Sequence, residues 1–221
     1  MKLSVVMPAL NEEACIGRSL ASAHGAHQVI VVDGGSSDAT CRLAAAAGAE
    51  VLSSPPGRGR QMNLGARQAS GDVLLFLHAD TILPFNFMGA VEGALRDGGW
   101  GRFDVVFDRS GPLLTVVARA ISWRSRLTRM AGGDQAIFVR RDLFEQVGGY
   151  QESDLFEDLD LCRRLKRQTK MGVATARVVT SSRRWRAGGT VATVLLMWVL
   201  RVCYLAGVPS STLSRFYADR R

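Results

Sequence analysis

The chain has 221 residues, of which 47% are hydrophobic, and this is enough for one large domain with a sizeable core. Its four cysteines lie far apart and form no CxxC pair, which argues against a structural zinc site or a disulfide framework and favours a reduced, cytoplasmic setting. The formal net charge of +8 is uneven, because residues 161–221 hold 13 basic side chains and one acidic side chain, so this part of the chain either meets an anionic partner or forms a solubilising basic face.

Short apolar runs alternate with helical patterns in the first half of the chain. The runs predict strands at residues 3–7, 29–32, 50–52 and 73–77. Because these runs are apolar throughout and helices separate them, they predict an α/β fold with a mostly parallel central sheet covered by helices on both faces. Asn11 is expected to cap the first helix, and Ser36 or Ser37 the second.

The second half is less regular and ends in an apolar stretch. Strands are expected at 102–107, 136–139 and 173–180, and helices at 113–127 and 156–168. Residues 188–208 are apolar over about the length of one membrane span, but Arg201 interrupts them and arginines flank both ends. We therefore expect a domain of residues 1–187, followed by an apolar helix and basic tail at 188–221. This tail is buried against the domain, forms a homodimer, or lies peripherally on an anionic membrane surface.

Polar and small residues follow three of the predicted strands. In open parallel sheets, ligands bind beyond the carboxyl ends of the strands. The Asp33 carboxylate can accept hydrogen bonds from a base or a ribose, and Gly34 lets a ligand approach the backbone; an ordinary turn into the next helix is the alternative. The residues at the three strand ends are Pro8-Ala9-Leu10-Asn11-Glu12, Asp33-Gly34 and His78-Ala79-Asp80.

A metal and a diphosphate are suggested by two short segments. In an extended chain, His78 and Asp80 point the same way, so both can reach one Mg²⁺ or Mn²⁺ ion that also binds phosphate oxygens. A turn in which Asp80 caps a helix is the alternative. The Gly57–Arg60 loop offers Arg58 and Arg60 to a diphosphate, or it is a solvated basic loop.

Glu157 and Asp158 stand at the start of a predicted amphipathic helix. Apolar residues recur at helical spacing along one stripe of this helix, and Asp158 borders the stripe, whereas Glu157 is explained by the helix dipole. A carboxylate beside apolar surface has a raised pKa and can act as a general base.

Together these segments resemble the family 2 glycosyltransferases, which have the GT-A fold, over roughly residues 1–186. The match rests on the order and spacing of four motifs, each weak alone. They are Val6–Glu13, Val32–Thr40, His78-Ala79-Asp80 in place of the DxD metal motif, and the Glu157-Asp158 pair. Segments Gly59–Asn63, Phe76–Thr81 and Gly133-Asp134-Gln135 further resemble a bacterial subgroup associated with radical-SAM or selenium-related genes.

The resemblance implies an inverting, metal-dependent transfer of a sugar from a UDP- or GDP-sugar to an unknown hydroxyl or phosphate acceptor. Asp158 would be the base, with Glu157 beside it, and Asp80 would be the main ligand of Mn²⁺ or Mg²⁺, because His78 replaces the first carboxylate. The Gln-x-x-Arg-Trp motif of processive members has Ser181 at its first position, which argues against processive synthesis. The nucleotide-binding residues implied are Pro8, Ala9, Asn11, Glu12, Asp33, Gly34, Arg60 and Ala79, and the acceptor-side residues are Gly133, Asp134, Gln135, Arg184 and Trp185.

Three other protein classes fit the sequence less well. A nucleotidyltransferase would carry a Gly-rich basic loop in the first strand-to-helix turn, and Pro8–Glu13 has none. A binding protein without catalysis is suggested only by His78. A nucleic-acid binder is not expected, because the basic tail has little aromatic interleaving and no recognised module.

Overall fold

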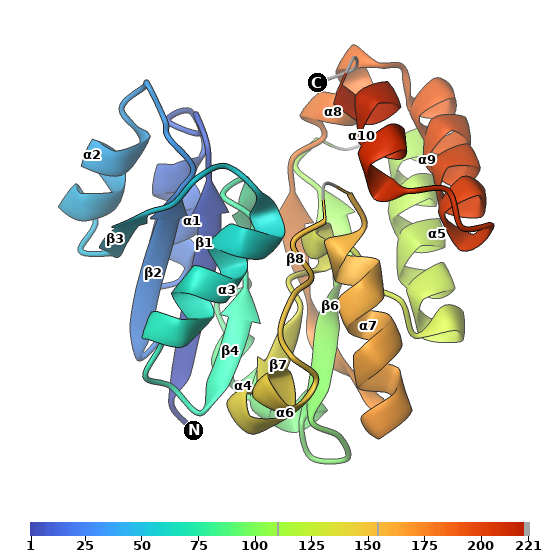
Figure 1. Ribbon diagram of the computed structural model, residues 1–221. Helices are drawn as coiled ribbons and strands as arrows, with labels where there is room; N and C mark the ends of the chain where they lie inside the picture. The colour runs from blue at the N-terminus through green and yellow to red at the C-terminus, as the bar shows by residue number, and fades with distance from the viewer. Residues whose placement is uncertain (110, 154, 219–221) are drawn as a thin grey trace.

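The computed structural model describes residues 1–109, 111–153 and 155–218 (Figure 1). Within these ranges an eight-stranded sheet has the order β3-β2-β1-β4-β7-β6-β8-β5. The strands are β1 (Leu3–Ala9), β2 (Gln28–Asp33), β3 (Glu50–Ser53), β4 (Val73–Phe76), β5 (Thr81–Ile82), β6 (Trp100–Phe107), β7 (Phe138–Arg140) and β8 (Met171–Thr180). The helices are α1 (Ile16–Ser22), α2 (Thr40–Ala46), α3 (Arg58–Gln68), α4 (Phe87–Ala94), α5 (Pro112–Thr128), α6 (Arg141–Gln146), α7 (Glu157–Gln168), α8 (Arg183–Ala187), α9 (Thr190–Leu205) and α10 (Ser210–Ala218), with a 3₁₀ turn η1 (Gly133–Gln135).

The sheet is mostly parallel, as expected. Strands β3, β2, β1 and β4 pair in parallel, and β6 pairs in parallel with β8. Strand β7 is antiparallel to both of its neighbours, and β5 is antiparallel to β8. Because β1, β2 and β4 run the same way, their carboxyl ends meet at one edge of the sheet, where the predicted ligand residues lie.

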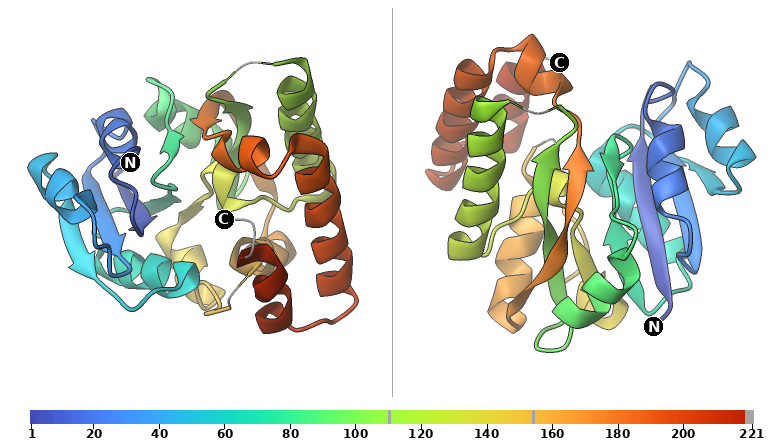
Figure 2. Two further views of the ribbon diagram at one scale, coloured as in Figure 1. Left: turned by 90° about the horizontal axis from the view of Figure 1, so that it is seen from above. Right: turned by 180° about the vertical axis from the view of Figure 1, so that it is seen from behind.

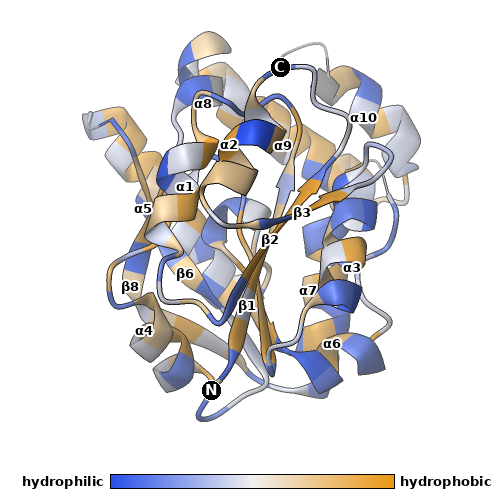
Figure 3. Ribbon diagram, turned by 90° about the vertical axis from the view of Figure 1, so that its left-hand side faces the viewer, coloured by the Kyte–Doolittle hydropathy of each residue, from blue (hydrophilic) through white to orange (hydrophobic). Residues whose placement is uncertain are grey.

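Helices cover both faces of the sheet (Figures 2 and 3). Successive side chains of a strand point to opposite faces, and in the central strands both sets are apolar, so each face needs a covering layer. Val5 and Met7 of β1 pack into one core with apolar residues of α1, α2 and α4. Val6 of the same strand packs into a second core with residues of α3, α6 and α7. All seven residues of β1 are buried, which explains its unbroken apolar run.

The helix caps expected from the sequence are wrong. Helix α1 begins at Ile16, and Asn11 lies before it in a left-handed conformation with φ of 53°. Instead of capping α1, Asn11 Oδ1 accepts a hydrogen bond from the Ser37 N–H (2.9 Å), and the Asn11 N–H donates to Ser36 Oγ (2.8 Å). These side chains join the β1–α1 turn to the β2–α2 turn, so they fix one strand end against the other.

The apolar C-terminal stretch forms α9 and is only partly buried. Its Leu200 packs in a small cluster with Leu155, Phe156 and Leu159 near α7 and with Leu213 of α10. Five large apolar residues of α9 are exposed: Val191, Leu195, Trp198, Val199 and Val202. In the described residues, no helix has both the length and the apolar character needed to cross a membrane.

Candidate active site

A large cleft opens at the carboxyl ends of β1 and β4. Its volume is about 1130 Å³, and its walls come from the β1–α1 turn, the start of α3, α5, η1, the start of α7, and the α8–α9 region. It gathers predicted site residues that are far apart in the sequence. Those that line it are Pro8, Ala9, Glu12, Arg60, His78, Asp80, Gly133, Asp134, Glu157, Asp158 and Trp185.

Asp33 lies at the end of β2 and is buried. Its Oδ2 accepts hydrogen bonds from the N–H groups of Gly35 and Ser36, both at 3.0 Å. Burial raises the pKa of the Asp33 carboxyl, but the hydrogen bonds from Ser36 and Gly35 outweigh it, and the pKa is lowered overall. Its Oδ1 is buried and accepts no hydrogen bond from a nitrogen or oxygen donor within the described part of the chain, and the Cys41 thiol also helps to lower the pKa. Asp33 is therefore ionised, and it lies at the end of β2 without lining the cleft itself.

Gln61 holds the ends of two strands together, and sequence analysis missed it. Its side-chain Nε2 donates to the carbonyl of Ala9 (3.0 Å) and to that of Val32 (2.7 Å). The Gly34 N–H also donates to the Ala9 carbonyl (2.9 Å). The sequence signal for Gln61 is its spacing from Gly65, four residues later, because residues four apart lie on the same face of a helix. Gly65 has no side chain, so this face of α3 approaches Val6 of β1 closely. The ends of β1 and β2 are thus held together, and Ala9 lines the cleft.

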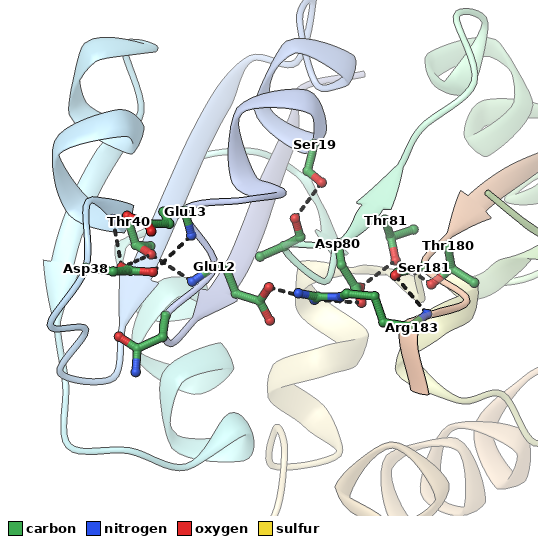
Figure 4. A network of polar contacts seen from close by, with 12 residues as sticks. Glu12, Glu13, Ser19, Asp38, Thr40, Asp80, Thr81, Thr180, Ser181 and Arg183 are labelled. Carbon is green, nitrogen blue, oxygen red and sulfur yellow. Dashed lines mark hydrogen bonds and ion pairs between the residues drawn. The ribbon is translucent and has the colours of Figure 1, made fainter. Parts of the chain in front are cut away.

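Asp80 lies beside an arginine that sequence analysis did not single out (Figure 4). Arg183 at the start of α8 forms an ion pair with Glu12 (2.8 Å), and its Nη2 lies 3.5 Å from Asp80 Oδ2. The three side chains come from the β1–α1 turn, the end of β4 and the end of β8. Ala79, between His78 and Asp80 in the sequence, is buried and does not line the cleft; its carbonyl accepts a hydrogen bond from Ser19 Oγ.

The donor set around Asp80 suits a hard divalent cation that also binds phosphate. Asp80 contributes one partly exposed carboxylate, and Mg²⁺ typically takes one or two carboxylates plus substrate phosphate oxygens. Among the residues that the structure describes, no group of three His, Cys, Asp or Glu side chains forms a complete metal cage. His78 instead contacts the η1 side, since a Cβ placed on Gly133 would lie 2.2 Å from His78 Nε2. A metal here would therefore depend on the ligand's own oxygens.

Asp158 is buried at the first turn of α7, next to η1. Its Oδ2 accepts a hydrogen bond from the Gly133 N–H (2.8 Å), and its Oδ1 accepts none from the described residues. Burial raises the pKa of Asp158, and the negative charge of Glu157 raises it further, while Arg58 and the Gly133 N–H partly offset this. The inward position was predicted from the apolar stripe, and the burial that follows from it raises the pKa of this carboxyl.

Glu157 points toward α3 rather than toward solvent. It is buried, and its Oε1 lies 3.9 Å from Arg58 Nη1. Arg60 lies two residues after Arg58, and its Nη2 is 3.0 Å from Glu152 Oε2 on the outer rim of the cleft. The two arginines of this basic segment therefore have different partners. Arg58 lies near the Glu157-Asp158 pair, whereas Arg60 pairs with Glu152 at the entrance of the cleft.

The predicted acceptor-side residues separate into two groups. Gly133, Asp134 and Trp185 line the cleft, and the Trp185 ring packs edge-on against Phe107 at 5.5 Å. Gln135 is fully buried below them, where its Nε2 donates to Phe103 O (3.3 Å) and Ser125 Oγ (3.1 Å), and it supports η1 from beneath. The side chain of Arg184 lies outside the described part of the chain.

Sequence comparisons place the chain among known proteins. A family model described as glycosyl transferase family 2 matches residues 4–142, more than half of the chain. An uncharacterised glycosyltransferase of Mycobacterium tuberculosis is 31% identical over 133 residues, which cover 56% of this chain and 59% of that protein. Glucosyl-3-phosphoglycerate synthase of the same organism is 36% identical over 96 residues, which cover 37% of this chain and 30% of that enzyme. The matched regions thus span well under two thirds of these relatives.

Solved structures show the same GT-A fold. A crystal structure of S. aureus TarS 1–349 with UDP-GlcNAc has a TM-score of 0.63 at 18% identity, covering 82% of this chain and 58% of that one. Glucosyl-3-phosphoglycerate synthase of M. tuberculosis with Mn²⁺ and UDP-glucose has a TM-score of 0.53 at 25% identity, covering 81% and 69%. The same enzyme with Mg²⁺ and UDP has a TM-score of 0.58 at 24% identity, covering 81% and 69%.

Proposed function

Because the chain belongs to glycosyl transferase family 2 and is a glycosyltransferase, we propose that it transfers one sugar at a time, with inversion, from a nucleotide-sugar to a hydroxyl or phosphate acceptor. The observation that carries the proposal is the free Oδ1 of Asp158, a buried carboxylate oxygen in the cleft that also contains Asp80. A general base must lie within reach of the proton that it removes, and Asp158 combines a raised pKa with a carboxylate oxygen that accepts no hydrogen bond from the described residues.

The donor would lie across the ends of β1 and β2. Asp33 Oδ1 is a buried acceptor suited to an N–H of the base or a ribose hydroxyl. UDP or a UDP-sugar is bound in the structures of TarS and glucosyl-3-phosphoglycerate synthase, which supports a uridine nucleotide as the first donor to test. Pro8, Ala9 and Glu12 line this side of the cleft, Asn11 joins their turn to the β2–α2 turn, and Arg60 would meet the diphosphate.

Asp80 would hold a divalent cation, and the relative crystallised with Mg²⁺ or Mn²⁺ supports that choice. When bound, such an ion neutralises negative charge on a departing nucleoside diphosphate. Arg183 stands beside Asp80 and supplies a second positive charge at the same place. His78 would complete the floor between Asp80 and Asp158, either as a further ligand or as a neighbour of the base.

Asp158 would take the proton of the acceptor hydroxyl through Oδ1 while its Oδ2 remains fixed by the Gly133 N–H. Glu157 keeps the proton affinity of Asp158 high, and Arg58 limits that effect. Gly133, Asp134 and Trp185 would border the acceptor. Ser181 in place of the glutamine of processive enzymes supports transfer of a single sugar. The similarity of Gly59–Asn63 to the radical-SAM-associated subgroup is a further proposal and names no substrate.

Titration calorimetry with UDP, GDP and TDP, each with and without Mn²⁺, tests the donor site. We expect UDP to bind more tightly with Mn²⁺, and we expect Asp33→Ala and Asp80→Ala to weaken that binding at least tenfold. Slow hydrolysis of the matching nucleotide-sugar, followed by NMR of the released sugar, then reports the anomeric outcome. Absence of binding by all three nucleotides in a folded protein would contradict the proposal, and a retained anomeric configuration would contradict inversion.

A further inference from the structure

The cleft extends away from Asp158 into an apolar groove between α5 and α9. Both helices lie at the same flank of the molecule in the views of Figures 1 and 2. Leu195 and Trp198 are 61% and 60% exposed, which is unusual for large apolar side chains that face a functional cleft. The apolar residues that line the groove include Leu113, Val116 and Ala120 of α5 and Val191, Leu195 and Trp198 of α9.

Two arginines face the same groove, one from each helix. Arg124 of α5 and Arg201 of α9 both line the cleft, on the side where Asp134 and Asp158 lie. Arg124 Nη1 donates to the Met130 carbonyl (3.2 Å), whereas its Nη2 is buried and has no acceptor among the described residues. A buried guanidinium donor without an acceptor is costly, and an anionic oxygen would satisfy it.

The charges around Arg124 favour an anion. Burial, followed by the positive charge of Arg201, lowers the pKa of Arg124 to about 10, and Asp134 and Cys162 offset these effects only in part. The two guanidinium groups repel each other, and a bound anion would reduce that repulsion. A phosphate matches the fork geometry of arginine, so it is the anion that this pair fits best.

We propose that the acceptor is an amphiphile whose attacking hydroxyl gives its proton to Asp158, whose phosphate binds Arg124 and Arg201 in the same cleft, and whose long apolar chain lies between α5 and α9. The inference rests on the proposed transferase function, and it names the class of acceptor. A second copy of the chain is a poorer occupant, because it would bring the same positive charge to the groove. A membrane surface alone would meet the outward-facing Val199 and Val202 and would leave the inner Arg124 Nη2 without an acceptor.

Calorimetry on the full chain with dodecyl phosphate, kept below its micelle concentration, tests the inference without any turnover. We expect dodecyl phosphate to bind at least tenfold more tightly than inorganic phosphate and than dodecyl glucoside, since only it fills both parts of the groove. Arg124→Gln should weaken binding at least tenfold. Leu195→Asp, which places a charge in the groove, should do the same, whereas Val202→Asp, equally exposed on α9 but outside the groove, should leave the affinity unchanged.

Three results would overturn the inference. They are equal affinity for inorganic phosphate, an unchanged affinity in Arg124→Gln with a wild-type melting curve, or equal losses in Leu195→Asp and Val202→Asp. If phosphatidylglycerol vesicles bind the chain and Val202→Asp alone abolishes that binding, the exposed helices serve surface attachment and not an acceptor. Because UDP binding is measured separately, a chain that binds UDP but not dodecyl phosphate would refute the acceptor class and leave the transferase proposal standing.

Discussion

The surroundings of Asp158 lead to a prediction for how kcat/KM depends on pH. The groups that face it are Glu157, Arg58, Asp134 and the η1 backbone, with Tyr150 behind it. Because its pKa is raised above the usual 3.8 and the base must be ionised, kcat/KM should fall as pH decreases through a pKa well above that value. A pH–rate profile of donor turnover measures this limb, and a profile flat down to pH 5 would contradict the assignment.

Substitutions of the two charged neighbours should move that limb in opposite directions. Glu157→Gln removes the negative charge that raises the pKa of Asp158, so the limb should shift to lower pH. Arg58→Gln removes the positive charge that lowers this pKa, so the limb should shift to higher pH. The comparison of the two profiles with wild type is the measurement, and shifts in the same direction would show that another group titrates.

Asp158→Asn should separate activity from stability. A carboxyl with a raised pKa binds more protons in the folded than in the unfolded state, so stability falls as pH rises from about 4 toward the folded pKa. The neutral amide avoids this loss, and we expect the free energy of unfolding at pH 8 to increase by on the order of 2 kcal/mol. Turnover should fall about 10²- to 10⁴-fold. Thermal unfolding of both proteins at pH 5 and pH 8 checks the stability change. The gain in free energy of unfolding of Asp158→Asn over wild type should be smaller at pH 5 than at pH 8.

The η1 turn depends on a missing side chain. A Cβ on Gly133 would lie 2.2 Å from His78 Nε2 and 2.8 Å from Asp158 Oδ2, so Gly133→Ala must displace the ends of both side chains. We expect turnover to fall at least tenfold, with a smaller effect on unfolding because side-chain ends move more easily than backbone. Steady-state kinetics together with thermal unfolding separate the two effects.

Gly89→Ala is the matched control for that substitution. Gly89 lies inside α4, where an added Cβ meets no atom within 4 Å. Alanine in an exposed helix interior is more favourable than glycine by about 0.5–1 kcal/mol, so this variant should be slightly more stable and fully active. A comparable loss of turnover in both variants would mean that Gly133 has no special place in the site.

At the level of helices and strands, the buried elements were predictable and their ends were not. The runs at 29–32 and 73–77 are apolar because their strands are covered on both faces, so composition alone revealed them. The expected caps failed because Asn11 bonds to a turn 26 residues away, a partner that local patterns do not reveal. Helix α4, with 8 residues, and strand β5, with 2 residues, are short, and both were missed.

At the level of the whole molecule, the site depends on contacts between distant segments. Asp158 was predictable because it borders an apolar stripe on its own helix. The role of Gln61 was not, because it bonds to the ends of two strands that precede it in the sequence. The same holds for Arg183, which is separated by 171 residues from Glu12 and by 103 from Asp80. Such ion pairs follow from topology, which brings the ends of β1, β4 and β8 to one edge.

Arg183→Gln tests how these distant segments cooperate. Its side chain is 53% exposed, and exposed ion pairs contribute at most about 1 kcal/mol, so unfolding should change little. Mn²⁺ alone should bind more tightly, because a positive charge 3.5 Å from Asp80 is removed, whereas UDP with Mn²⁺ should bind less tightly, because the diphosphate loses a cation. Electron paramagnetic resonance of free Mn²⁺ and calorimetry with UDP measure the two affinities. Arg186→Gln, an exposed arginine on the same short helix, should change neither, and a parallel loss of both affinities in Arg183→Gln would show that this arginine merely supports the fold of α8.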